Sequence, residues 1–179
     1  MPALLGRLLA RIRTPPKGGG PGDYEGWALE VEGVTRAWES PNHFGLGTVA
    51  LFFVLDNQAG TIIPNPAKIA EVQTYLDGKA PITVGGNAGH VYAMAPTESP
   101  INPTISVTPD TTAIRAAVEA ELEDMLYREA EPGGTIYLSQ IREAISLAED
   151  EQYHTLTLPA ADHAAPAGYL PTLGTVTWA

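Results

Sequence analysis

Seven consecutive apolar residues, Val49 to Leu55, constrain the fold of this chain more than any other feature of its sequence. The run is rich in residues that favour strands, and it is much shorter than the ~20 residues that cross a bilayer. A strand that is apolar on both faces needs a central place in a sheet that is covered above and below. We therefore predict such a strand over Gly47–Asp56, and we predict that nothing in the chain crosses a membrane.

The residues around this run predict the rest of a first α+β unit. Val34–Trp38 precedes it across a turn-rich loop, so the two segments are expected to form a hairpin, and His90–Ala95 supplies a third strand. Asp23 can cap a short helix, and Asn65–Pro66 can open a second one. The inward residues of that second helix would be Ile69, Val72 and Leu76. The order helix, strand, strand, helix, strand resembles a ferredoxin-like unit without its first strand.

The second half of the chain predicts another α+β unit. After a strand at about Ile101–Val107, Thr108 would cap the longest helix. The apolar stripe of that helix consists of Ile114, Val118, Leu122, Met125 and Leu126. Ser139 would cap a further helix, with Ile141 and Ile145 inward. Two more strands are expected at Tyr153–Leu158 and Leu173–Trp178, and a loop would separate them.

Proline and glycine divide the chain into parts. Pro15–Gly22 cannot hold a helix and predicts a linker after an amphipathic helix over residues 4–12. A second proline-dotted stretch, Pro96–Pro103, predicts an exposed connector. We therefore divide the chain into residues 1–22 (helix and linker), 23–97 (first α+β unit) and 98–179 (second α+β unit). The predicted fold class is α+β, with two small α/β-sandwich-like units.

The charge of the chain argues against a nucleic-acid partner. The net charge is −11 at pH 7, and residues 1–20 hold four basic residues and no acidic one, which leaves −15 on the rest. A body of this charge repels a phosphate backbone. The chain also has no cysteine, which excludes a disulfide framework, a thiolate nucleophile and a zinc site of the cysteine type.

The sequence offers no set of residues with the spacing of a catalytic, metal or cofactor site. The histidines lie far apart, at His43, His90, His154 and His163. Asp162 and His163 are the one adjacent pair of acid and imidazole, but no G-x-S-x-G motif supplies a nucleophile. We therefore predict a protein that is not an enzyme, with no catalytic, cofactor-binding or metal-binding residues. The alternative left open here is a small hydrolase that uses Asp162 and His163 with a distant serine.

Glycine clusters and acidic runs have simple interpretations as turns and solvated surfaces. The glycines at 18–20, 85–86 and 133–134 lack the pattern of phosphate-binding loops. Glu121, Glu123 and Asp124 lie on the polar side of a helix, and Glu149–Glu151 lies at a helix end. Gly85–Gly89 leaves a second alternative open, a ligand-binding ferredoxin-like regulatory domain. Six aromatic residues suit either a core or a protein interface: Trp27, Trp38, Tyr92, Tyr153, Tyr169 and Trp178.

Several segments resemble, in order, the baseplate J-like proteins of Mu-type phages and prophages. They are Pro15–Gly19, Asp23–Tyr24, Trp27–Trp38, Gly47–Val49, Ala95–Thr97, Thr108–Asp110, Glu131–Ser139, Ile141–Ile145 and Leu173–Trp178. Each segment is weak alone, and their shared order over residues 4–178 makes the resemblance specific. The chain resembles the C-terminal half of such a protein, because the family usually has a comparably long portion ahead of the helix expected near Leu4. Gly85–Gly89 resembles a local insertion.

The resemblance implies a structural component of a contractile-tail baseplate wedge, with no catalytic residues. Such wedges ring the tail hub and couple receptor contact to contraction of the sheath. The implied partners are other wedge, hub and sheath proteins, with self-association as a further option, and neither nucleic acid nor membrane. The implied location is the tail baseplate of the virion, and the host cytoplasm during assembly.

Overall fold

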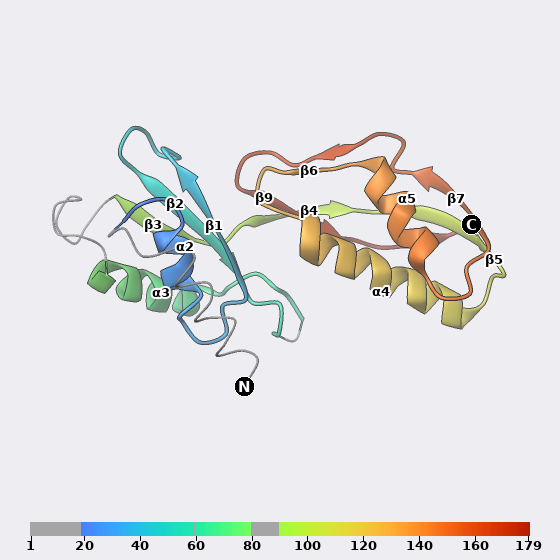
Figure 1. Ribbon diagram of the computed structural model, residues 1–179, viewed down its shortest axis with the longest axis horizontal. Helices are drawn as coiled ribbons and strands as arrows, with labels where there is room; N and C mark the ends of the chain where they lie inside the picture. Colours follow the sequence, from blue (N-terminus) through green and yellow to red (C-terminus); the bar gives the residue numbers. More distant parts are fainter. Residues whose placement is uncertain (1–18, 59, 80–89) are drawn as a thin grey trace. The chain divides into compact units, whose positions relative to one another are not determined.

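The computed structural model describes residues 19–58, 60–79 and 90–179. The chain forms two compact units, which divide between Ala95 and Pro96 (Figure 1). Both units combine helices with small sheets, so the predicted α+β class is confirmed. The helix predicted over residues 4–12 and the Gly85–Gly89 segment lie outside the described residues. Among the helices of the described ranges, none is long and apolar enough to span a bilayer.

In its described residues, the first unit contains two helices and a three-stranded sheet. Its elements are α2 (Asp23–Ala28), β1 (Arg36–Pro41), β2 (Val49–Val54), α3 (Pro66–Lys79) and β3 (Val91–Met94). The strand order is β1-β2-β3, with β1 antiparallel and β3 parallel to β2. The predicted hairpin, third strand and order of elements are thus confirmed. Asn65 caps α3 as expected, because its side chain accepts a hydrogen bond from the Lys68 N–H at 2.8 Å.

The central strand β2 is buried on both faces, as the apolar run predicted. Leu51, Phe53 and Leu55 form one core cluster with residues of α2 and α3, namely Tyr24, Ala28, Val72 and Leu76. Successive side chains of a strand point to opposite faces, so Ala50 and Phe52 lie on the other face. These two are also buried.

The connection from β2 through α3 to β3 differs from that of a complete ferredoxin-like sheet. In that fold another strand lies between the two parallel strands of each strand-helix-strand segment. Here Val49 of β2 lies directly opposite Val91 of β3. No strand therefore lies between β2 and β3, where a complete ferredoxin-like sheet would have one. In the described residues the sheet has three strands instead of four.

Glu39 of β1 holds the N-terminal end of α2. Its carboxylate accepts hydrogen bonds from the backbone N–H groups of Gly22, Tyr24 and Glu25 at 2.9–3.2 Å. The capping role predicted for Asp23 is wrong, because Asp23 is the first residue of α2. Its carboxylate instead accepts hydrogen bonds from the backbone N–H groups of Gly19 and Gly20. Residues 19–22, the end of the predicted linker, are therefore bonded to the first unit.

Glu25→Gln should stabilise the first unit at neutral pH. Burial, and then the charge of Glu39, raise the pKa of Glu25 above its usual value. The fold thus favours the neutral form of the Glu25 side chain. The contribution of that form to the stability of the fold is fully present at low pH and is lost as the pH rises through the raised pKa. The variant should melt a few degrees higher than the natural chain at pH 7. Below about pH 4 the two should melt alike, since both side chains are then neutral.

The control for this pH dependence is Glu32→Gln, because Glu32 is exposed in the turn that follows α2. It should leave the melting temperature unchanged at both pH values. A rise for Glu25→Gln of equal size at both pH values would contradict the electrostatic explanation. Scanning calorimetry measures all three proteins directly.

The second unit contains two helices and three small sheets. Its helices are α4 (Thr112–Glu129) and α5 (Leu138–Leu147). The strands are β4 (Thr97–Ile101), β5 (Thr104–Thr108), β6 (Thr135–Ile136), β7 (Tyr153–Leu158), β8 (His163–Ala164), β9 (Tyr169–Leu173) and β10 (Thr177–Trp178). They pair as β10-β5-β7, β4-β9 and β6-β8, and α4 packs against α5 and β9 (Figure 1). All five residues of the predicted α4 stripe are buried.

Both helix caps predicted for the second unit are wrong. Thr108 is the last residue of β5 and pairs with Tyr153, so α4 begins later. Its cap is Thr111, whose hydroxyl accepts a hydrogen bond from the Ile114 N–H at 3.2 Å. Ser139 is the second residue of α5, not its cap. The first N–H of that helix, on Leu138, instead donates to the carboxylate of Asp162 at 2.9 Å.

Two segments predicted to be irregular form strands. Thr97–Ile101, within the expected connector, is β4 and pairs in parallel with β9. Proline has no N–H to donate, but an edge strand such as β4 tolerates Pro100. Part of the loop expected before Leu173 is also structured, since it contains β8 and most of β9, and Leu170 of β9 is fully buried.

Candidate functional site

The structure places the predicted pair of Asp162 and His163 next to a serine. Nε2 of His163 on β8 lies 2.8 Å from the hydroxyl oxygen of Ser99 on β4. The two strands belong to different sheets, which this hydrogen bond connects. The sequence could not reveal the serine, because it stands 64 residues away in the chain.

The contacts of this group are those of a structural hydrogen bond, not of a catalytic triad. In a triad the carboxylate binds the second imidazole nitrogen and orients the ring. The Asp162 carboxylate instead binds the first N–H of α5, where the helix dipole also favours a negative charge. The geometry therefore lends no support to the hydrolase alternative.

Ser99→Ala should lower the free energy of unfolding of the second unit by about 1 kcal/mol, because it removes one partly buried hydrogen bond. Denaturant unfolding measures this loss. Ser146→Ala, at an exposed position of α5, is the matched control and should cost less. Hydrolysis of p-nitrophenyl acetate should not differ between the natural chain and Ser99→Ala. A lower rate in the variant would revive the hydrolase alternative.

The other histidines have separate local contacts. His43 approaches the hydroxyl of Ser40, His90 the carbonyl of Gly47, and His154 the carboxylate of Glu151. Within the described ranges, no group of three or more potential ligands could hold a metal ion. Glu123, Asp124, Glu149 and Asp150 are exposed, as their helix positions suggested. The solvated position expected for Glu151 is wrong, because its side chain is only 7% exposed and contacts His154. Gly85–Gly89, the basis of the ligand-binding alternative, lies outside the described residues.

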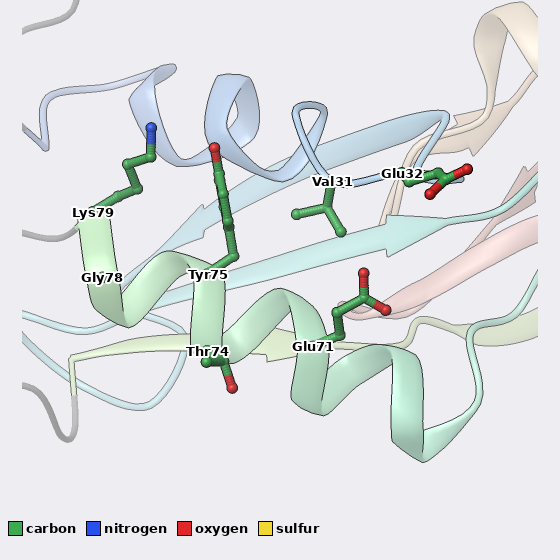
Figure 2. A pocket seen from close by; sticks show the side chains of 7 residues that line it. All are labelled: Val31, Glu32, Glu71, Thr74, Tyr75, Gly78 and Lys79. Carbon is green, nitrogen blue, oxygen red and sulfur yellow. The ribbon is translucent and has the colours of Figure 1, made fainter.

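A groove of about 590 Å³ lies on the first unit, between α3 and the turn that follows α2 (Figure 2). Val31 and Tyr75 point into it, with Glu32 and Glu71 toward one end and Lys79 at the other. The Glu30 carboxylate accepts hydrogen bonds from the Tyr75 hydroxyl and from Lys79. Contact with Tyr75, and then with Glu30, raises the pKa of Lys79, which therefore stays positively charged. The groove offers an apolar wall to a binding partner, and the charged groups Glu71 and Lys79 at its ends are paired with Lys68 and Glu30.

The six aromatic residues divide into packed and exposed groups. Trp27 packs on the core of the first unit and meets Tyr24 edge to face. Trp38 lies under the guanidinium of Arg36, Tyr92 meets Phe44, and Trp178 lies under Arg115. Tyr153 and Tyr169 are 66% and 40% exposed, and they remain candidates for an interface.

Comparison with known proteins identifies the family. Residues 16–86 match the domain family described as "Baseplate J-like central domain". Residues 101–179 match the one described as "Baseplate J-like protein C-terminal domain". The chain belongs to the baseplate J-like family. This confirms the resemblance that the ordered segments indicated, with one family domain in each unit.

Relatives of this baseplate J-like chain occur in a phage and a prophage. It is 37% identical over 180 residues to the baseplate protein gp47 of Escherichia phage Mu, and 36% identical to the Mu-like prophage FluMu protein gp47 of Haemophilus influenzae. Both alignments cover 98% of this chain and 50% of the relative, so the chain spans about half the length of these proteins. A chain of the anti-feeding prophage baseplate, solved by cryo-electron microscopy, matches 86% of this chain with a TM-score of 0.49 and 13% identity.

Proposed function

We propose that this chain is a structural component of a contractile-tail baseplate wedge, and that it acts through protein contacts instead of catalysis. The observation that carries the proposal is the succession of both baseplate J-like domains along the chain, together with its identity to the Mu baseplate protein. The hydrogen bonding of Asp162 and His163 also favours a structural role over hydrolysis.

In this role the two units present surfaces to neighbouring wedge, hub and sheath proteins. The candidate surfaces are the groove on α3 and the exposed apolar residues of both units. The protein would reside in the tail baseplate of the virion and, before assembly, in the cytoplasm of the host. The acidic body suits partners with basic surfaces, because opposite charges steer association and disfavour wrong partners.

A deletion in the source phage or prophage tests the role. Without the gene, electron microscopy of induced lysates should show sheath and tube structures that lack baseplates, or no assembled tails. Supplying the gene in trans should restore intact tails, and antibody labelling should place the protein at the baseplate end. Intact, contractile tails in the deletion strain would refute the proposal.

A further inference from the structure

The edge strands of the two units differ in how they are protected. An edge strand presents peptide groups to which another chain can add a strand, and proteins block such edges with proline, charge or a covering group. In the first unit, Gln73 of α3 covers the outer edge of β3. Its side-chain oxygen accepts the Ala93 N–H at 2.8 Å, and its amide nitrogen donates to the Val91 carbonyl at 3.0 Å. Gln73 thus binds two peptide groups of β3 that an added strand would need.

Other edge strands carry the usual blocking residues. The strand β1 contains Arg36 and Glu39 and ends at Pro41. In the second unit, the edge strands β4 and β9 contain Pro100 and Pro171. The strands β6, β8 and β10 are two residues long, too short to template much pairing.

The edge strand β7 contains none of these blocking residues. It lies at the end of the sheet β10-β5-β7 and is six residues long. Among edge strands of five or more residues in the described part of the chain, it alone contains no proline, lysine, arginine, aspartate or glutamate. Tyr153 is 66% and Leu158 is 49% exposed, and Thr155 and Thr157 are exposed between them.

The charge around β7 indicates the chemistry of a partner. Residues 143–179 contain five acidic residues and no lysine or arginine. Glu149 and Asp150 are exposed in the turn that leads directly into β7. A strand added to β7 would place one of its ends beside this turn, where basic side chains would be attracted and acidic ones repelled.

We propose that the outer edge of β7 is a docking site for an extended, uncharged segment of a partner protein that has basic residues at one end. The inference rests on the proposed scaffold role and names one of its contacts. A second copy of this chain fits the edge poorly, because each copy carries a net charge of −11 and the same acidic turn. Hydrogen bonds between the backbones would supply the affinity, and the basic residues at one end of the segment would determine which partner binds.

Amide hydrogen exchange on the full chain tests the proposal with defined peptides. The probe is a blocked peptide of alternating threonine and valine with two lysines at one end, made in both orientations. It should slow exchange within residues 153–158 by roughly tenfold or more at saturation, and leave residues 91–94 unchanged. The same peptide with two glutamates should bind about tenfold more weakly, and a version with a central proline should not bind.

Charged variants distinguish the β7 edge from other surfaces. Thr155→Lys with Thr157→Lys should abolish the protection, because edge lysines block strand addition. Ala116→Lys with Ala120→Lys adds the same charge to exposed positions of α4 and should preserve it. The proposal is overturned if millimolar peptide gives no protection at residues 153–158, if both flanks bind equally, or if the chain alone dimerises through β7. These outcomes leave the deletion test of the scaffold role unaffected.

Discussion

Phe53→Ala should lower the free energy of unfolding of the first unit by about 3–5 kcal/mol. Phe53 is fully buried in β2, where it packs in the cluster that joins α2 and α3 to the sheet. Truncation removes its buried apolar surface and leaves a cavity that the surrounding strands can only partly close. Unfolding followed by amide exchange, segment by segment, measures the loss in each unit separately.

The same experiment tests whether the two units unfold independently of one another. If they unfold separately, Phe53→Ala should leave exchange in α4 and α5 unchanged, and Leu122→Ala in α4 should destabilise the second unit alone. Phe53→Leu is the conservative control and should cost less than half as much as the alanine variant. Equal loss of protection in both units after Phe53→Ala would show that the two units unfold as one cooperative block.

Glu39→Ala should cost the first unit about 2–3 kcal/mol, a large effect for one polar residue of a strand. The substitution leaves the N–H groups of Gly22, Tyr24 and Glu25 without their acceptor. Hydrogen bonds to a charged group contribute more than neutral ones, and the first turn of a helix has no internal acceptors for its donors. Chemical denaturation gives the stability change, and the amides of Tyr24 and Glu25 should exchange faster.

Two controls separate this anchoring role from general effects of the substitution. Glu39→Gln keeps an acceptor oxygen without the charge and should lose about half as much stability. Glu123→Ala removes an exposed carboxylate from α4 and should change stability by no more than about 0.5 kcal/mol. If Glu39→Ala and Glu123→Ala proved equally mild, the contacts with α2 would contribute nothing measurable.

Elements defined by their own local pattern could be predicted from the sequence. The doubly apolar run gave the central strand β2, and the stripe from Ile114 to Leu126 gave the buried face of α4. Asn65 was recognisable as a cap because its partner, Lys68, stands three residues away. These patterns depend on side-chain period and short-range hydrogen bonds, which the sequence contains in full.

Features that depend on distant partners could not be predicted. Glu39 serves α2 across at least 14 positions, and Asp162 serves α5 across 24. Thr108 has the local pattern of a cap, but it is the last residue of β5, and its pairing with Tyr153 of β7 decides its conformation. The prolines in residues 96–103 predicted an irregular connector, but an edge strand such as β4 accommodates proline without loss of a ladder hydrogen bond.

The candidate sites likewise include features that the sequence could predict and features that it could not. The separation of the histidines was visible in the sequence, and the ordered segments were enough to indicate the family that comparison confirmed. The contact between Ser99 and His163 and the cover that Gln73 gives to β3 were not visible, since each joins elements that lie far apart in the chain. The groove between Val31 and Tyr75 arises from packing and likewise has no local signature.

The parallel pairing of β4 with β9 has a consequence for synthesis on the ribosome. Thr97 of β4 pairs with Tyr169 of β9. During synthesis β4 therefore follows the first unit out of the ribosome and has no pairing partner until β9 has been made. At ~5–20 residues per second the wait lasts roughly 4–14 s, long enough for a neighbouring polypeptide to capture an exposed strand. Glu98 and Pro100 make β4 a poor template during that interval, so the residues that hid the strand from sequence patterns also protect the growing chain.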